Sequence, residues 1–307
     1  MVLNIEKFIR EQIKDIKEDI DSNRAISAVS GGVDSSVVAV LVYEAGIKTE
    51  NYFIDDFFRK KNEYKFIKNA LAKRGINVKC YDAKERMFNA LEGISDNDRK
   101  RPIFIKEFYG IFGELIKQSE ATHLFQGTNK VDKKMFEKGQ LQHNVGVPFQ
   151  EYGIKHVVEP VKELYKHEIR EIARAIGLPK EISERAPFPG PGLVIRCLGE
   201  ITKEKIELVR EGLAIAEEEL DYLNPFQVVV AISGDKVCSM IDRAIPDKYM
   251  LIIRAVKSKD AMTAEGIIPS QELKAKLEEK LIDLSSNKVG RVLWDSTNKP
   301  KGTIEYI

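Results

Sequence analysis

One short stretch limits what this chain can fold into more than any other: residues 28–36, Ala-Val-Ser-Gly-Gly-Val-Asp-Ser-Ser. A mostly apolar run, residues 25–29, leads into it, and a second run, residues 37–42, follows it. This order predicts a buried strand, a tight loop and the first turn of a helix. Adjacent glycines let the backbone approach an anion closely, and the N–H groups and dipole of the next helix favour negative charge. The stretch therefore predicts a phosphate-binding loop at the end of a strand.

The side chains of this loop indicate which phosphate chemistry it serves. Ser30, Ser35 and Ser36 can donate hydroxyl hydrogen bonds to phosphate oxygens. Asp34 would repel a phosphate unless a cation lies between them, which predicts Mg2+. The Gly-Lys-Ser/Thr ending of the common P-loop is missing. The loop instead resembles that of the N-type ATP pyrophosphatases, which hold the β- and γ-phosphates and cut ATP between α and β. An ordinary Gly-Gly turn is the alternative interpretation.

The first half of the chain alternates short apolar runs with helical patterns, which is typical of a parallel sheet with helices on both faces. Ligands of such sheets bind at the carboxyl ends of the strands. Ser30, Asp55 and Gln126 each come just after a predicted strand, so they should converge on one crevice. The predicted strands are 25–29, 51–54, 78–81, 123–125 and 157–158, and the predicted helices are 5–20, 37–45, 64–71, 84–91, 104–118 and 164–176.

A segment rich in proline and glycine, residues 187–192, marks a boundary because it cannot form regular helix or the interior of a sheet. The pattern beyond it predicts a smaller α+β domain. Its expected helices are 203–223 and 271–281, and its expected strands are 227–232, 250–256, 289–294 and 303–306. We therefore expect a nucleotide-binding domain over residues 1–186 and an α+β domain over residues 187–307.

Composition is ordinary for a globular protein and argues against several classes. The net charge of +1 gives no support for nucleic-acid binding. No apolar run approaches the length of a membrane span, and the N-terminus does not resemble a signal peptide. The three cysteines and four histidines show no metal-binding or redox spacing. We therefore expect a cytoplasmic protein with neither a nucleic-acid nor a membrane partner.

A second polar motif follows the strand predicted at residues 123–125. Gln126, Gly127 and Thr128 leave this strand, and Asp132 comes four residues later. A second carboxylate near a triphosphate would suit Mg2+, which usually takes one or two carboxylates plus phosphate oxygens. Taken alone, the segment could equally be a polar loop.

Four segments together are similar to the ATP-pyrophosphatase subunit of GMP synthetases, which aminate XMP to GMP. These segments are Ser-Gly-Gly-Val-Asp-Ser-Ser at 30–36, Gln-Gly-Thr at 126–128 with Asp132, Pro-Phe-Pro-Gly-Pro-Gly-Leu at 187–193 with Arg196, Gly199 and Glu200, and Asp-Ser-Thr-Asn-Lys-Pro-Lys-Gly-Thr-Ile-Glu at 295–305. The resemblance implies an adenine-nucleotide α-hydrolase-like fold and a ligase that forms a C–N bond. It implies that O2 of XMP attacks the α-phosphorus of ATP, which releases pyrophosphate, and that ammonia then displaces AMP at C2.

The resemblance also implies which residues form the site and what they bind. The residues expected to bind ATP and pyrophosphate are Ser30, Gly31, Gly32, Val33, Asp34, Ser35, Ser36, Gly127 and Thr128. Asp34 and Asp132 are expected to be catalytic and to hold Mg2+, with Lys138 as a third catalytic residue. The residues expected to bind XMP are Arg101, Gln227, Lys299, Thr303, Ile304 and Glu305. Because the C-terminal domain of the family dimerises, a homodimer is also implied.

Among the segments that depart from the family pattern, two bear on the lid and the adenine side of the site. The lid segment, Gln140–Asn144, lacks the usual lysine, for which the nearby Lys138 could substitute. Asp55 to Phe58 places bulky residues where the family has a small one, which would crowd or reshape the adenine side. These changes leave two alternatives open: another ATP pyrophosphatase such as NAD synthetase, or a paralogue that binds nucleotides but is catalytically weakened.

The chain shows no glutaminase of its own. A glutamine amidotransferase needs a nucleophilic cysteine in a strand-elbow setting and a further domain, and Cys80, Cys197 and Cys238 lack that context. Ammonia is therefore expected from solution or from a separate glutamine amidotransferase subunit.

Overall fold

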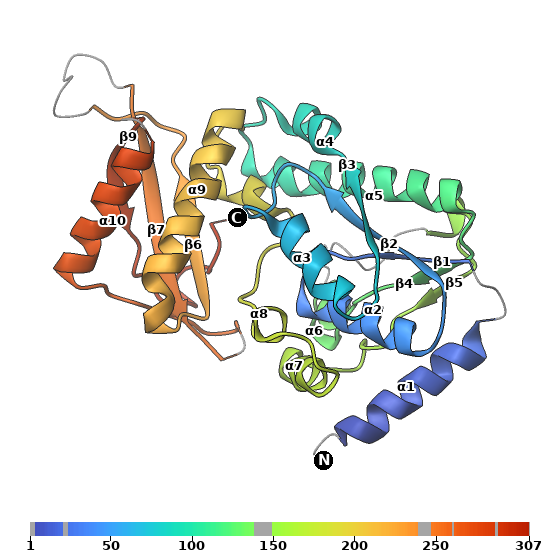
Figure 1. Ribbon diagram of the computed structural model, residues 1–307. Coiled ribbons are helices and arrows are strands. Elements are labelled where there is room, and N and C mark those ends of the chain that lie inside the picture. The colour runs from blue at the N-terminus through green and yellow to red at the C-terminus, as the bar shows by residue number, and fades with distance from the viewer. Residues whose placement is uncertain are drawn as a thin grey trace. The chain divides into compact units, whose positions relative to one another are not determined.

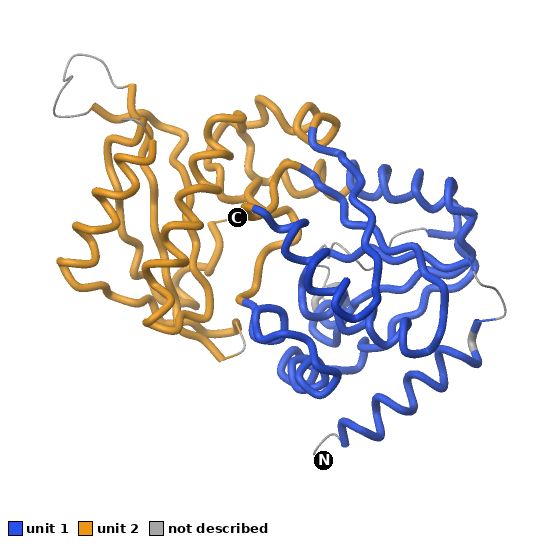
Figure 2. The backbone as a smooth tube through the Cα atoms, in the orientation of Figure 1, with its two compact units in different colours: residues 1–56, 62–84, 106–185 blue, residues 57–61, 85–105, 186–307 orange. Residues whose placement is uncertain are grey.

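The computed structural model describes residues 4–20, 24–137, 149–238, 247–259, 261–285 and 288–306. The chain divides into two compact units (Figure 2). The first comprises residues 1–56, 62–84 and 106–185, and the second comprises residues 57–61, 85–105 and 186–307. The second unit thus takes in two short segments that precede residue 187 in the sequence. The division into domains at residue 187 stays a prediction.

The first unit is built on a five-stranded parallel sheet in the order β3-β2-β1-β4-β5 (Figure 1). Every neighbouring pair of strands is parallel, which confirms the predicted sheet. The strand order changes direction at β1, so the crevice between β1 and β4 is the switch point where ligands bind in such sheets. The strands are β1 (Ala25–Ala28), β2 (Thr49–Asp55), β3 (Val78–Asp82), β4 (His123–Phe125) and β5 (His156–Val158).

Helices flank this sheet and supply most of the core of the first unit. Helix α2 is buried along most of its length, and both α1 and α7 pack against it. The apolar side of α1 contributes Ile5, Phe8, Ile9 and Ile13 to this core. The helices through residue 183 are α1 (Ile5–Asp19), α2 (Val33–Glu44), α3 (Glu63–Ala72), α4 (Lys84–Leu91), α5 (Asn97–Ser119), α6 (Lys130–Glu137), α7 (Lys166–Ala175) and α8 (Lys180–Ser183), with a 3-10 turn at Phe149–Tyr152.

Two helices begin earlier than the sequence predicts. Helix α2 begins at Val33, inside the phosphate-loop motif, rather than at residue 37. Helix α5 begins at Asn97 rather than at residue 104, and it includes Pro102 near its start. Both early turns carry polar residues, so apolar periodicity alone could not detect them.

The second unit contains a small mixed sheet with two helices packed on it. Strand β7 pairs antiparallel with β6 and β8 and parallel with β9. Helix α9 packs against β6, and α10 packs against β9 and α9. The elements are β6 (Gln227–Ile232), β7 (Tyr249–Lys257), β8 (Glu265–Gly266), β9 (Val289–Trp294), α9 (Lys203–Leu220), α10 (Gln271–Leu284) and 3-10 turns at Gly192–Arg196 and Asp221–Leu223.

The prediction of a strand at residues 303–306 is wrong, because these residues form no strand in the structure. The main-chain oxygens of Thr303 and Ile304 instead accept hydrogen bonds from the buried guanidinium of Arg254, at 3.2 Å each. A side-chain partner therefore replaces the sheet partner that the apolar pattern predicted.

A buried lysine, Lys100, is a feature of the second unit that the sequence does not signal. Its Nζ donates to the side-chain oxygen of Asn97 at 2.7 Å and to the main-chain oxygens of Cys197 and Gly199 at 2.5 and 2.6 Å. Burial lowers the pKa of Lys100 from its ordinary 10.5 to about 8. The lysine ties the start of α5 to the turn that follows residue 196.

This shift predicts a pH dependence of stability. Below pH 8 the lysine is charged in both states, but between pH 8 and 10.5 the folded state loses its proton while the unfolded state keeps it. The unfolded state then binds more protons, so the free energy of unfolding should rise across this window, by about 1–3 kcal/mol relative to Lys100→Met. Denaturant titrations of both proteins from neutral pH to pH 10.5 measure it. If the difference in the free energy of unfolding between the wild type and Lys100→Met stayed constant with pH, it would contradict the lowered pKa of Lys100.

Candidate nucleotide-binding site

The predicted phosphate loop joins β1 to α2 at the switch point of the sheet. Gly31 has φ +82°, a conformation that a Cβ would strain. A Cβ at this position would also lie 2.1 Å from Cδ1 of Ile67 on α3. Backbone conformation and close packing therefore both require a glycine here.

Several hydrogen-bond donors of the loop gather at the first turn of α2. The hydroxyl oxygens of Ser30 and Ser35 lie 3.2 Å apart, and the N–H of Gly32 reaches Ser30 Oγ at 3.4 Å. The Ser36 hydroxyl is buried and has no hydrogen-bond partner among the described residues. Together with the N-terminal end of the α2 dipole, these donors suit an anion.

The second motif touches the first. A Cβ at Gly127 would lie 2.7 Å from the backbone nitrogen of Ser35 and 2.9 Å from the carbonyl carbon of Asp34. The next residue, Thr128, has a buried Oγ1 that lacks a hydrogen-bond partner within the described ranges. Strand β4 therefore delivers Gly127 directly against the start of α2, as the strand-end rule predicts for Ser30 and Gln126.

The contact at Gly127 predicts a large effect of one methyl group. Gly127→Ala should push the turn after β4 away from the backbone of residues 34–35. We expect nucleotide-dependent pyrophosphate release to fall about 100-fold, because displacements near 1 Å have such effects. Steady-state assays measure this. The control is Gly46→Ala, where a Cβ meets nothing within 4 Å; because its φ of +76° makes this substitution cost stability, both rates are compared at a temperature at which thermal unfolding shows each variant to be folded. Equal rates for both variants would contradict the contact.

Asp34 has one oxygen paired and the other unpaired. Its Oδ2 lies 2.5 Å from Lys166 Nζ, and its buried Oδ1 has no hydrogen-bond partner in the described part of the chain. Lys166 is the first residue of α7, just beyond the carboxyl end of β5. The sequence analysis did not include this lysine among the site residues, although its position after a predicted strand could have indicated that it lies near the phosphate loop. It places a cation beside the phosphate loop.

Asp132 and Asn129 begin helix α6 together. Asp132 Oδ2 accepts from the N–H of Asn129 at 3.1 Å, and Asn129 Oδ1 accepts from the N–H groups of Val131 and Asp132 at 2.9 and 3.2 Å. This reciprocal pattern is that of a capping box. Asp132 therefore has a structural role at the helix start, and its role as a metal ligand stays a prediction.

The acidic groups fit a metal that the nucleotide helps to bind. Among the described residues, no three His, Cys, Asp or Glu side chains gather as a ligand set. Mg2+ does not need such a set, because it is usually held by one or two carboxylates and by phosphate oxygens. The unpaired Oδ1 of Asp34 fits this mode. Lys138 and the lid segment Gln140–Asn144 lie outside the described residues.

In the second unit, Glu305 is the centre of a charged cluster. Arg196 donates to both of its oxygens, from Nε to Oε2 at 3.1 Å and from Nη2 to Oε1 at 2.8 Å. Gln227 Nε2 donates to Oε1 at 2.6 Å. The structure therefore brings Gln227 and Glu305 together, as expected, and adds Arg196, to which sequence reasoning gave no site role.

The other residues expected to bind XMP have different surroundings. Thr303 and Ile304 are held through their carbonyl groups by Arg254, while Lys299 Nζ donates to the main-chain oxygen of Ala261 at 2.7 Å. Arg101 lies in α5, in the segment of that helix that belongs to the second unit. Binding of XMP by these residues stays a prediction.

Phe58 belongs to the segment expected to crowd or reshape the adenine side, and that effect stays a prediction. Its side chain is fully buried and packs edge-on against Phe104, with ring centroids 6.3 Å apart. Its carbonyl accepts from the N–H of Leu193 at 2.9 Å. Phe58 is therefore a core residue of the second unit.

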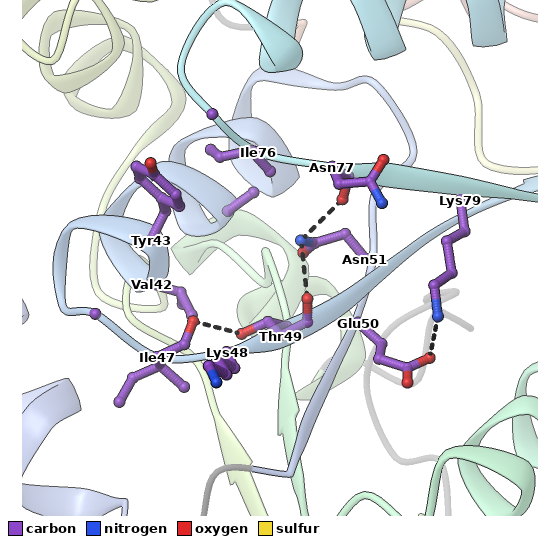
Figure 3. Close-up of a pocket in the computed structure, with 13 residues that line it drawn as sticks. Val42, Tyr43, Ile47, Lys48, Thr49, Glu50, Asn51, Ile76, Asn77 and Lys79 are labelled. Atoms are coloured by element: carbon purple, nitrogen blue, oxygen red, sulfur yellow. Dashed lines mark hydrogen bonds and ion pairs between the residues drawn. The ribbon is translucent and has the colours of Figure 1, made fainter.

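A pocket of about 340 Å³ lies at the other edge of the first sheet (Figure 3). Its lining includes Tyr43, Thr49, Asn51 and Ile76, near the amino ends of β2 and β3. None of the residues expected to bind nucleotide or metal lines it. In a parallel sheet this edge is opposite the phosphate loop, so the pocket is not part of the candidate site.

The parallel sheet and the phosphate loop at its switch point define a nucleotide-binding α/β protein of the ATP-pyrophosphatase class. Two family models match the chain: NAD synthase over residues 1–190 and GMP synthase C terminal domain over residues 219–306. Curated relatives, each named as one subunit of a glutamine-hydrolyzing GMP synthase, align over almost the whole chain. The relative from Pyrococcus abyssi is 39% identical and covers 99% of this chain and 100% of its own length, and that from Archaeoglobus fulgidus is 40% identical with the same coverage. The chain belongs to the family of this GMP synthase subunit.

A solved structure supports the fold alone. NMN synthetase from Francisella tularensis superposes with a TM-score of 0.50 at 13% identity, covering 69% of this chain and 87% of that one. The helices of the described ranges include none that is long and apolar enough to cross a membrane.

Proposed function

We propose that this chain is the ATP-pyrophosphatase component of a GMP synthase, a ligase that adenylates XMP and lets ammonia replace AMP. The observation that carries the proposal is the joining of two parts in one chain. The phosphate loop lies in the first unit, and the match to the C-terminal domain of GMP synthase, residues 219–306, lies in the second. Each part alone is compatible with other enzymes.

The loop can promote cleavage between the α- and β-phosphates by holding the leaving group. The hydroxyl groups of Ser30 and Ser35 and the N–H of Gly32 can bind the β- and γ-phosphates. Negative charge grows on pyrophosphate as it leaves, and preorganised donors stabilise such charge. Lys166 adds a cation beside the loop and could supply what the altered lid lacks. Asp34 and Asp132 would hold Mg2+, which neutralises phosphate charge when it is bound.

The charged cluster around Glu305 can recognise the purine. Arg196 holds the Glu305 carboxylate through two hydrogen bonds, which fixes its orientation. A carboxylate in a fixed orientation can accept hydrogen bonds from the ring N–H groups of XMP. Lys299 and Arg101 are proposed to bind the XMP phosphate, since cationic donors suit a dianion.

The proposal includes a separate glutamine amidotransferase subunit and a homodimer. The names of the relatives describe one subunit of a glutamine-hydrolysing enzyme, which supports a partner that supplies ammonia. The homodimer is proposed from the family resemblance, because the second unit matches the GMP synthase C-terminal domain, which is used for dimerisation in that family. Light scattering of the purified chain measures the oligomeric state. A cytoplasmic location stays a prediction.

Two alternatives remain to be tested against this function. NAD synthase is not favoured, because the match to that family ends at residue 190 while the second unit matches GMP synthase. A paralogue that only binds nucleotides would keep the loop and lose turnover. Pyrophosphate release from ATP with Mg2+ and ammonium, measured with XMP, UTP or deamido-NAD, separates the three. Release with XMP alone supports the proposal, and ATP binding without release from any substrate supports the paralogue.

A further inference from the structure

An ion pair beside the phosphate loop carries an inference about how the loop is held. Arg185, the last residue of the first unit, donates from Nη1 to the carbonyl oxygen of Gly31 and from Nη2 to Glu63 Oε1, each at 2.9 Å. The Arg185 and Glu63 side chains are only 15% and 3% exposed. A guanidinium shared between a carbonyl and a buried carboxylate has little freedom, because its planar fork fixes both directions.

Arg185 is itself fixed by three helices. Its N–H donates to the carbonyl of Ile182 in α8 at 3.3 Å, and its carbonyl accepts from Nη2 of Arg170 in α7 at 3.0 Å. Its guanidinium carbon lies 5.9 Å from the ring centroid of Phe66 in α3. The loop is therefore tied, through one side chain, to a rigid part of the first unit.

The carbonyl that Arg185 holds belongs to the peptide between Gly31 and Gly32. This peptide is trans, and in a planar trans peptide the C=O and the N–H point in opposite directions. Holding the oxygen on the Arg185 side therefore directs the Gly32 N–H to the other side, where Ser30 Oγ lies at 3.4 Å. A peptide between two glycines can rotate freely, so its orientation is decided by the hydrogen bond that its carbonyl oxygen accepts from Arg185.

We propose that Arg185, supported by Glu63, is a positioning residue that orients the Gly31–Gly32 peptide so that its N–H faces the terminal phosphates of ATP. The inference rests on the proposed use of the loop as the pyrophosphate site. Without the hydrogen bond from Arg185, the peptide can rotate and direct its carbonyl oxygen toward the bound nucleotide, where it repels a phosphate. A donor that is oriented beforehand needs no reorganisation when the ligand binds.

The test compares ligands that carry the terminal phosphates with one that does not. Arg185→Gln and Glu63→Gln should each raise the dissociation constants of ATP and inorganic pyrophosphate about tenfold, with Mg2+ present throughout. The dissociation constant of AMP should not change, because AMP lacks the β- and γ-phosphates. Arg185→Lys keeps the charge but cannot bridge both acceptors, so it should give an intermediate value. The matched control is Arg174→Gln, which removes the more exposed ion pair with Glu184.

Equal weakening of all three ligands would show a general structural role and would overturn the proposal, as would wild-type ATP and pyrophosphate affinity in Arg185→Gln. Thermal unfolding identifies a variant that does not fold, in which case Glu63→Gln provides the test. Failure of the proposed function is a separate outcome. Pyrophosphate binding needs no XMP, so the positioning role can hold even if the chain does not aminate XMP.

Discussion

Asp34→Asn is expected to lower XMP-dependent pyrophosphate release by about 10²- to 10³-fold, the size of effect seen when one stabilising group is removed from an active site. The asparagine keeps the shape of the side chain but removes its charge. The Lys166 ammonium then loses its anionic partner, and the unpaired Oδ1 no longer offers a carboxylate to a cation. Steady-state pyrophosphate release with saturating ATP and XMP measures the effect.

The matched control for this prediction is Asp82→Asn. Asp82 ends β3 at the same edge of the sheet, and its side chain is 69% exposed. Its ion pair with Lys84 is long, at 3.4 Å, and the oxygen of an asparagine can keep the hydrogen bond that Asp82 Oδ1 accepts from the N–H of Lys84. The control should keep the wild-type rate, and AMP binding should be unchanged in both variants. Wild-type turnover by Asp34→Asn would remove Asp34 from the catalytic residues.

Glu305→Ala is expected to lower the free energy of unfolding by about 3–5 kcal/mol, because it leaves the charge of a buried arginine without its partner. The Arg196 side chain is only 1% exposed, and both of its bonds to Glu305 are lost. Gln227 loses its acceptor as well. Denaturant titration measures the stability. The same variant should no longer use XMP, although ATP should still bind.

A double variant separates stability from recognition. Replacing a buried ion pair by apolar residues of similar size is often neutral, so Arg196→Met with Glu305→Met should recover most of the lost stability. It should not recover XMP-dependent turnover, because no carboxylate remains to accept from the purine. If the stabilised double variant aminated XMP at the wild-type rate, Glu305 would be a structural residue only. Removing residues 299–307 would be a poorer test, because it would also remove the two carbonyl groups that accept hydrogen bonds from Arg254.

Elements with short apolar runs between clear breaks could be predicted from the sequence. The strands at 123–125 and 227–232 have the predicted ends, because polar or turn-forming residues bound each run. That the two loop motifs lie at one edge of the sheet also follows from sequence, since all strands of a parallel sheet present their carboxyl ends at the same edge. The contact of Gly127 with the backbone at Ser35 is the result.

Interactions between distant charged residues could not be predicted in this way. Lys166 and Asp34 are 132 residues apart, and neither periodicity nor local spacing links them. Lys100 and Arg185 look like ordinary surface charges in the sequence, because a lysine or arginine is rarely buried unless specific partners surround it. Those partners, such as the carbonyl groups of Cys197 and Gly31, are backbone atoms that any residue supplies.

The most direct test of the proposed function follows one oxygen atom. The chain is incubated with ATP, Mg2+, ammonium and XMP that carries an isotopic label in its 2-oxo group, and the products are analysed by mass spectrometry. If O2 of XMP attacks the α-phosphorus and ammonia then displaces AMP at C2, the label must appear in the phosphate of AMP, and GMP must form without it. Unlabelled AMP, or pyrophosphate release without GMP, would contradict the proposal that this chain adenylates XMP.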